Sequence, residues 1–405
     1  MFSKEFFVNN RRRLAASTEL DLLVVGANGL LQKSADTTFP FRQDSNFWYL
    51  SGCEVAEAII VIDKKTGKDY IILPRRLAHR DQWEGSIDFE ELKRISGVDR
   101  VYSYVEGWQA LKTASSKVKR IGTVEPPKPY QAHFGMYMNP AKQALSRRLK
   151  KLGTEFLDIR MLLARLRQIK TSDEVSALQQ AIAITAKGLA EVHERLSSMS
   201  NERDISNHLT YSFAVNGASG HGYDPIVACG VNAATIHYEK NDAPLNETSL
   251  LLLDVGAQYG KYSADISRTW SLNTPTNRQQ SVHDAVKRVH AYALSLLKPE
   301  MTLRAYEKSV REYMKAELYN LGLVGNADTK EHLKYFPHLT SHFLGIDVHD
   351  AGDYDAPIKP NTVITVEPGI YIPNEQIGVR IEDDVLITDT GYVNLSQSIP
   401  TDLVY

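Results

Sequence analysis

Cysteine is scarce in this sequence, with only Cys53 and Cys229 among 405 residues. The two lie far apart and match neither a disulfide framework nor a Cys-x-x-Cys metal or redox motif. This usage fits a reducing compartment, and we expect a cytoplasmic protein. An excess of positive charge is also missing, because 47 Lys and Arg stand against 49 Asp and Glu, a net charge of -2. Nucleic acid and anionic lipid are therefore poor candidates as partners.

Long apolar runs are missing as well. A membrane-spanning helix needs about 20 apolar residues, and the longest runs here, 58–62 and 250–253, are far shorter. Residues 1–17 contain no apolar stretch long enough for a signal peptide, and Glu5 argues against a transit peptide despite three arginines at 11–13. We therefore expect neither a membrane span nor a targeting segment.

The remaining composition is that of a packed globular chain, with 43% hydrophobic and 24% charged residues. At roughly 150 residues per domain, the length predicts two or three domains. In the first part, short apolar runs at 20–25, 58–62 and 70–73 alternate with helical patterns at 6–16 and 141–152. This alternation is typical of an α/β domain.

A helix start separates this region from the rest. Thr171 can cap the backbone while Glu174 reaches back to it, which predicts a long helix that ends near residue 197. Beyond it we expect helices packed on antiparallel strands, an α+β domain, with the boundary near Ile169. The expected helices are 202–216, 278–297 and 303–321, and the expected strands are 249–255, 262–270, 363–372 and 378–387.

Two acids interrupt the first pair of these apolar strands. If the turn is Tyr259-Gly260, Asp254 faces Asp265 with Cβ atoms about 5 Å apart. Like charges at that separation destabilise a sheet, and aspartate is a poor strand residue. One acid at a strand end and another on a solvated face would explain the pattern without a ligand, whereas a buried pair needs a neutralising partner.

The second pair of strands repeats the anomaly. A turn centred on residues 374–375 places Glu367 opposite Glu382, although a bulge at residues 368–369 would change that register. Four carboxylates then lie on apolar strands, and Arg380 is the one basic side chain on the second pair of strands. One guanidinium cannot balance four acids, whereas a pair of divalent metal ions can.

Histidines are available beside these acids, because four of the 12 lie between residues 332 and 349. His338 and His342 have the i, i+4 spacing of a helical zinc pair, but the glutamate of the His-Glu-x-x-His signature is absent. Oxygen ligands favour Mg, Ca or Mn, and an imidazole beside them shifts the choice toward Mn, Fe, Co or Zn. A histidine taken alone is more commonly structural.

Five positions and their flanking residues closely resemble the pita-bread metallopeptidases, which include methionine aminopeptidase, aminopeptidase P and prolidase. These positions are Asp254, Asp265, His342, Glu367 and Glu382. Residues 34–52 resemble the N-terminal domain of aminopeptidase P, which methionine aminopeptidase lacks. The resemblance implies an α/β N-terminal domain over residues 1–168 and an α+β pita-bread (creatinase/aminopeptidase-like) catalytic domain over residues 169–405.

The resemblance also implies a site for two divalent metal ions. Asp254 would bind one metal, and Asp265 and Glu382 would bridge the two. His342 and Glu367 would complete the shell of the other, and Glu367 would take a proton from the attacking water. The metal in aminopeptidase P is usually Mn, and Zn or Co would be alternatives. A water molecule between two such ions becomes a nucleophile near neutral pH.

Three histidines match pocket residues of the same family. His237 and His349 resemble histidines that line the site and contact the substrate around the scissile bond. His338 resembles a third pocket histidine that is not a ligand. By this likeness they would stabilise the tetrahedral intermediate or pass a proton to the departing proline nitrogen. Alternatively, His237 would only cap a strand.

Three further residues match positions beside the family's site. Arg380 and Tyr371 resemble residues next to the metal cluster, and Trp83 resembles a tryptophan that the N-terminal domain presents near the substrate. Each has a plainer explanation. Arg380 would merely balance the acids, Tyr371 would belong to the core, and Trp83 would be an ordinary core or surface aromatic.

The function implied is an aminopeptidase that cuts the Xaa-Pro bond of peptides with proline at the second position, as a homo-oligomer, either dimer or tetramer. Prolidase is the nearest alternative, but residues 350–366 lack the arginine with which animal-type prolidases bind the dipeptide carboxylate, and contain only Lys359. The short connection at 373–377 also departs from many aminopeptidases P. A non-catalytic binding module or a metal-free creatinase-like enzyme would have no electrostatic reason to keep four acids on buried strands.

Overall fold

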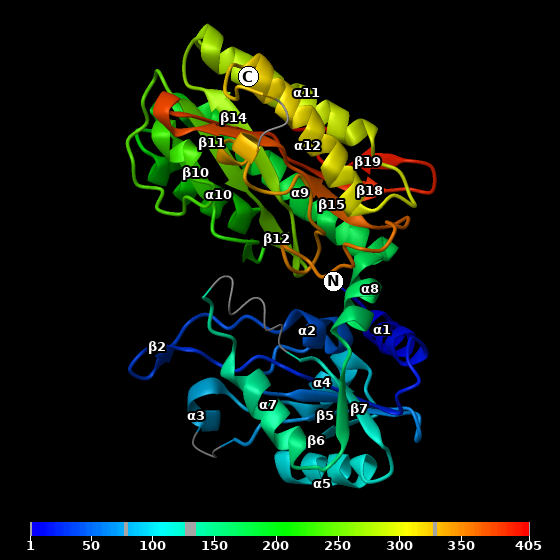
Figure 1. Ribbon diagram of the computed structural model, residues 1–405. Coiled ribbons are helices and arrows are strands. Elements are labelled where there is room, and N and C mark those ends of the chain that lie inside the picture. The colour runs from blue at the N-terminus through cyan, green and yellow to red at the C-terminus, as the bar shows by residue number, and fades with distance from the viewer. Residues whose placement is uncertain (1, 77–79, 126–134, 327–329, 405) are drawn as a thin grey trace. The chain divides into compact units, whose positions relative to one another are not determined.

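The computed structural model describes residues 2–76, 80–125, 135–326 and 330–404. Its chain divides into two compact units, Met1–Leu166 and Arg167–Tyr405 (Figure 1). Within the described ranges, none of the helices combines the length and the apolar character that a bilayer crossing requires.

A six-stranded mixed sheet in the order β6-β5-β4-β1-β7-β8 forms the centre of the first unit. The apolar runs predicted as strands are its middle: β1 (Leu22–Gly26) pairs antiparallel with β4 (Ile59–Asp63), which pairs antiparallel with β5 (Lys68–Ile72). The outer strands join in parallel and are β6 (Arg100–Tyr102), β7 (Arg120–Thr123) and β8 (Glu155–Asp158).

The helices of this unit connect and cover the sheet, and the two helical patterns predicted in it form α1 and α7. The full set is α1 (Lys4–Ala16), α2 (Ser45–Ser51), α3 (Arg80–Glu84), α4 (Phe89–Ser96), α5 (Tyr104–Ser115) and α7 (Pro140–Lys150), followed by α8 (Arg160–Gln168), which runs into the second unit. A small hairpin of β2 (Gln32–Ser34) and β3 (Thr37–Thr38) precedes α2.

The second unit combines short antiparallel sheets with four long helices, as the predicted α+β class requires. The helices are α9 (Ser172–Arg195), α10 (Glu202–Val215), α11 (Asn277–Ser295) and α12 (Leu303–Asn320). The strands are β9 (Gly220–His221), β10 (Ile226–Cys229), β11 (Leu250–Val255), β12 (Ala257–Tyr259), β13 (Tyr262–Ser263), β14 (Ile266–Ser271), β15 (Val363–Val366), β16 (Gly369–Ile372), β17 (Ile377–Arg380), β18 (Asp383–Ile387) and β19 (Tyr392–Asn394).

Each pair of helices has its own apolar layer. The predicted capping box opens α9, because Thr171 and Glu174 exchange side-chain to backbone hydrogen bonds. The α9 and α10 pair packs on β10, β11 and β14, and the α11 and α12 pair, side by side in yellow in Figure 1, packs on β15 to β18. Apolar burial therefore fixes both acid-bearing hairpins against helices.

The register predicted for the first hairpin was wrong by two residues. Its turn consists of Gly260 and Lys261, whose φ angles of 55° and 74° are those of a type I′ turn. Asp254 consequently pairs with Ser267 instead of Asp265. Because side chains alternate with a period of two, this shift leaves both acids on the same face of the hairpin.

The register predicted for the second hairpin is correct. Gly369 pairs with Arg380 in β16 and β17, and Val366 pairs with Asp383 in β15 and β18, so the same register holds on both sides of the break. No bulge at residues 368–369 therefore displaces Glu367 relative to Glu382.

Candidate metal centre and its surroundings

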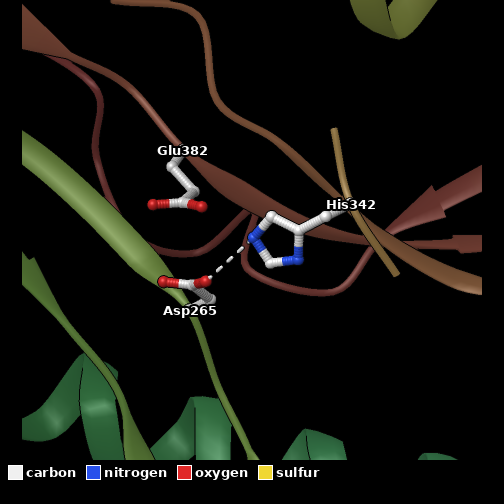
Figure 2. A group of neighbouring side chains, drawn as sticks. All are labelled: Asp265, His342 and Glu382. Carbon is white, nitrogen blue, oxygen red and sulfur yellow. Dashed lines mark ion pairs between the residues drawn. The ribbon is translucent and has the colours of Figure 1, made fainter. Parts of the chain in front are cut away.

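Three of the five predicted ligands converge in the second unit, as Figure 2 shows. Asp265, His342 and Glu382 each offer one ligand atom, and these atoms lie within 4.8 Å of one another. Nε2 of His342 is 3.3 Å from Oδ2 of Asp265. Nδ1 of His342 lies 3.0 Å from the carbonyl oxygen of Phe343. Since that oxygen can only accept, Nδ1 donates to it, and Nε2 is the ring nitrogen that faces the acids and would bind a metal on losing its proton.

Glu367 adjoins this group, whereas Asp254 faces a cation. Oε1 of Glu367 lies 3.4 Å from Nε2 of His342. Asp254 accepts hydrogen bonds from Nη2 of Arg380 and from the hydroxyl of Tyr223, both at 2.5 Å. The structure therefore gathers four of the predicted ligands and places the fifth in an ion pair.

Burial and mutual repulsion raise the pKa values of Glu382, Glu367 and Asp254. Burial is the largest cause that holds the pKa of Glu382 well above its usual range, and the charges of Asp265 and Glu367 raise it further. Burial raises the pKa of Glu367 to about 7 and also raises the pKa of Asp254, although Arg380 opposes the latter shift. The cluster therefore resists carrying its full negative charge without added cations.

This donor set fits divalent metal ions. Four carboxylates and one imidazole nitrogen combine the hard and borderline ligands that Mn, Co and Zn accept. Burial opposes the charged form of His342, yet the hydrogen bond to Asp265 and the charge of Glu367 outweigh it and raise its pKa to about 9. A bound cation would displace that proton and relieve the repulsion among the acids.

Arg380, Tyr371 and His338 form one chain of hydrogen bonds beside the cluster. Arg380 donates from Nη1 to the hydroxyl of Tyr371, which lies 2.8 Å from Nε2 of His338. Nδ1 of His338 is 2.8 Å from the carbonyl oxygen of Leu339, so Nδ1 carries the proton and the Tyr371 hydroxyl donates to Nε2. Burial and the charge of Arg380 lower the pKa of His338 to about 3. His338 therefore stays neutral.

The other two predicted pocket histidines, His237 and His349, lie near these hydrogen-bonded residues. The rings of His349 and His342 meet edge to face, with centroids 4.3 Å apart. His237 is exposed, and its charge contributes to lowering the pKa of both His338 and His349. Burial is the largest cause of the latter shift, to about 4. The three histidines thus border the same region of the second unit.

Trp83 belongs to α3 of the first unit, and its side chain is 84% exposed. It is therefore a surface aromatic of that unit and no part of its core. Its predicted contact with substrate stays a prediction.

Three functional neighbours escaped the sequence analysis. Tyr223 donates to Asp254, and Ser267 donates to Oε2 of Glu382 at 2.6 Å while accepting from Nε of Arg380 at 2.8 Å. Asp384 accepts from the backbone N–H of Asp265, and its other carboxylate oxygen has no partner in the described part of the chain. The signal for Ser267 was its place two residues after Asp265, on the same strand face.

Charged pairs outside the cluster hold the loops that carry His338 and His349. Glu307 on α12 accepts from the backbone N–H of Thr340 at 2.9 Å, and Arg311, one turn later, donates to the carbonyl of His338 at 3.1 Å. The two side chains also form an ion pair at 2.5 Å. Glu307 and Arg311, which we call the brace on α12, therefore hold both ends of the segment 338–340 by hydrogen bonds.

The loop around His349 is held from the start of the second unit. Arg167 donates to Asp347 at 2.8 Å and also to Asp350, and Nζ of Lys170 lies 3.3 Å from Asp350. Arg167, Lys170 and Asp350 are all buried, so this is a charge-compensated interior network. The network holds Asp347 and Asp350, which lie on either side of His349 in the sequence.

Comparison with known proteins identifies the family. The model for metallopeptidase family M24 matches residues 176–389, more than half of the 405 residues. The chain belongs to metallopeptidase family M24. The M24 match lies within the second unit, and the model for the aminopeptidase P N-terminal domain matches residues 7–121. Both halves of the predicted family resemblance are thereby confirmed.

Relatives of this M24 chain share its full extent. An Xaa-Pro aminopeptidase from Haemophilus influenzae is 30% identical over 422 residues, covering 99% of this chain and 96% of that protein. The structure of Escherichia coli aminopeptidase P with the inhibitor Pro-Leu has a TM-score of 0.87 and 27% identity, covering 99% and 96%. Its zinc-substituted form in complex with product has a TM-score of 0.85 at the same identity and coverage. The predicted pita-bread fold is confirmed.

Proposed function

We propose that this chain is a metal-dependent aminopeptidase that hydrolyses the Xaa-Pro bond and releases the N-terminal residue of peptides. The observation that carries the proposal is the convergence of Asp265, His342 and Glu382 within an M24 match that spans residues 176–389. The full-length similarity to Xaa-Pro aminopeptidases supports the substrate class.

The proposed ligands are Asp254, Asp265, His342, Glu367 and Glu382, for two divalent ions. Mn²⁺ is the ion we favour, with Zn²⁺ or Co²⁺ as alternatives, because the donors are mostly carboxylate oxygens joined by one imidazole. Metal ions held there would lower the pKa of a water molecule and polarise the scissile carbonyl group. For Asp254 to take part, its carboxylate would have to share its charge between a metal and Arg380.

The residues around the cluster would carry out proton transfer and charge stabilisation. Glu367 lies between two imidazoles, 3.4 Å from Nε2 of His342 and 3.6 Å from Nδ1 of His338, and would accept the proton of the attacking water. His237 and His349 would stabilise the oxyanion and deliver a proton to the departing proline nitrogen. Arg380 and Tyr371 would keep His338 neutral and fixed.

The substrate would extend beyond proline. The interval 350–366 contains Lys359 as its one basic residue, so it offers no arginine to hold the carboxylate of a dipeptide. Longer peptides would therefore be preferred. Cys53 and Cys229 are buried free thiols, which supports a reducing compartment such as the cytoplasm. A dimer or tetramer, expected from the family resemblance, stays a prediction that light scattering would test.

The decisive assay compares an Xaa-Pro dipeptide with an Xaa-Pro-Xaa tripeptide, using Mn-loaded protein with and without chelator. Chelator-sensitive release of the first residue from the tripeptide, at a higher kcat/KM than from the dipeptide, is the expected result. The reverse preference would make the protein a prolidase. Failure to cut either peptide, by protein shown to contain metal, would contradict the proposed function.

A further inference from the structure

A single buried carboxylate accepts four hydrogen bonds from the loop that carries His237. Glu202 is the first residue of α10, and its exposed fraction is 0%. Its Oε1 accepts from the backbone N–H of Cys229 at 2.8 Å and from the Asn232 amide at 3.0 Å. Its Oε2 accepts from the Tyr238 hydroxyl at 2.8 Å and from the backbone N–H of Ala243 at 2.9 Å.

All four donors are neutral groups and all lie between residues 229 and 243. An ionised carboxylate is costly to bury unless hydrogen bonds replace its water, and two oxygens can accept about four such bonds. The start of α10 also supplies a favourable helix dipole. The carboxylate of Glu202 therefore has its full set of hydrogen bonds only when the loop 229–243 folds around it. The conformation of that loop thus depends on the charge of Glu202.

The same loop packs against residues of the candidate site. Ile236 and Tyr238, on either side of His237, pack in an apolar cluster that includes Tyr371. At the base of the loop, a Cβ atom added to Gly378 would lie 2.0 Å from the carbonyl oxygen of Ala233, so this turn rests directly on the β17 backbone. The position of His237 is therefore set from two sides, by β17 and by Glu202.

We propose that Glu202 is a positioning residue, which holds His237 in place for substrate through its hydrogen bonds to the loop 229–243. The inference rests on the proposed function, in which His237 contacts the substrate. Glu202 itself is fully buried under the loop, so a bound substrate would not reach its carboxylate. Its effect on catalysis therefore passes through the loop, and the double-mutant cycle below measures the share carried by His237.

The test is a double-mutant cycle with Glu202→Gln and His237→Ala, assayed on the tripeptide. Glutamine keeps the size of the side chain but replaces one acceptor oxygen by an NH₂ group, which faces donors. We expect kcat to fall about 10- to 100-fold with little change in KM, as for misplaced catalytic groups. In the His237→Ala background the same change should cost less than about 3-fold, because the group it positions is absent.

Two further variants separate positioning from general destabilisation. Tyr238→Phe removes one of the four hydrogen bonds and leaves the carboxylate, and it should give a smaller kcat loss that also disappears with His237→Ala. Glu317→Gln is the matched control, because Glu317 is a buried carboxylate on α12 that pairs with Arg288 of α11 at 2.7 Å. It should lower the melting temperature without lowering kcat.

Hydrogen exchange gives a readout that needs no activity. In Glu202→Gln, amides of residues 229–243 should exchange faster, whereas those of residues 338–349 should not. Equal kcat losses in both backgrounds, or unchanged exchange in the loop, would overturn the inference. If the wild-type protein cuts no Xaa-Pro peptide, the proposed function fails instead, and the exchange experiment still decides whether Glu202 fixes the loop.

Discussion

Arg380 donates from Nη2 to Oδ2 of Asp254 at 2.5 Å, so a buried guanidinium already neutralises one of the five proposed ligands. The same side chain donates to Ser267 and to Tyr371. One arginine thus links the acid cluster to the pocket histidine His338 through fixed hydrogen bonds. Its positive charge compensates part of the negative charge of the cluster, and metal ions would compensate the rest.

Replacing Arg380 by lysine should retain the metals and impair turnover. Lysine carries the charge but cannot reach Asp254, Ser267 and Tyr371 from one planar group. We expect kcat to fall about 10- to 100-fold, with metal content per chain unchanged by elemental analysis. Arg288→Lys, at the α11 to α12 ion pair, is the control and should leave kcat intact. Full activity of Arg380→Lys would refute the positioning argument.

Asp265→Asn should weaken metal binding and sharply reduce activity. The change keeps the shape of the side chain but halves its acceptor oxygens and removes its charge from the group with His342 and Glu382. Metals supply several kcal/mol of transition-state stabilisation, so kcat should drop about 1000-fold or more. Calorimetric titration with Mn²⁺ should show weakened binding. Asp355→Asn, on an exposed ion pair with Arg304, is the control. Normal turnover by Asp265→Asn would exclude the mechanism.

Metal-free protein should lose thermal stability as the pH rises from about 6 to about 9. The pKa values of Glu367 and His342 are raised in the folded state, to about 7 and about 9. Stabilisation from a raised pKa is complete below the unfolded pKa and is lost as the pH rises through the folded one, so both groups act in the same direction. Bound Mn²⁺ should reduce the slope, because the cation takes the place of the protons.

Melting temperatures measured with chelator and with Mn²⁺ across this pH range provide the check. The separation between the two curves should widen toward high pH. A metal-free melting temperature that increases through this range would show that the folded acids do not carry raised pKa values.

Breaking the brace on α12 should slow catalysis without loss of metal. Glu307→Gln weakens the ion pair with Arg311 and the hydrogen bond from Thr340, so the segment that carries His338 gains freedom. We expect a kcat decrease of about 3- to 10-fold. Glu312→Gln, on the same helix and half exposed in its pair with Lys315, should have no effect. Equal behaviour of the two variants would contradict the role of the brace.

Much of the fold was predictable because the local signals agree with one another. Apolar runs mark β1, β4 and β5, and the capping box of Thr171 and Glu174 marks the start of α9. Four of the five proposed ligands stood out because carboxylates on apolar strands violate both propensity and electrostatics, whereas the assignment of His342 rests on the family resemblance. The roles of all five as ligands remain predictions, although four of them lie together.

What escaped prediction depends on tertiary contacts. The central residues of the first turn are Gly260 and Lys261, which both have positive φ values. Because a glycine can occupy either central position of such a turn, the sequence does not distinguish this turn from one at residues 259–260. Glu202 looks in sequence like an ordinary acid in the first turn of a helix. Its hydrogen-bond donors lie 27 to 41 residues away along the chain, so no local pattern could reveal them.

Gly378 has a consequence for how this pocket tolerates change. Where β17 meets Ala233, one main chain lies on another, with no room for even a methyl group between them. Main-chain surfaces keep their shape when side chains vary, so loop residues other than Asn232 and Tyr238, which bind Glu202, can be substituted while the imidazole of His237 keeps its place. That freedom would end at position 378, where a single added carbon would lift the whole loop.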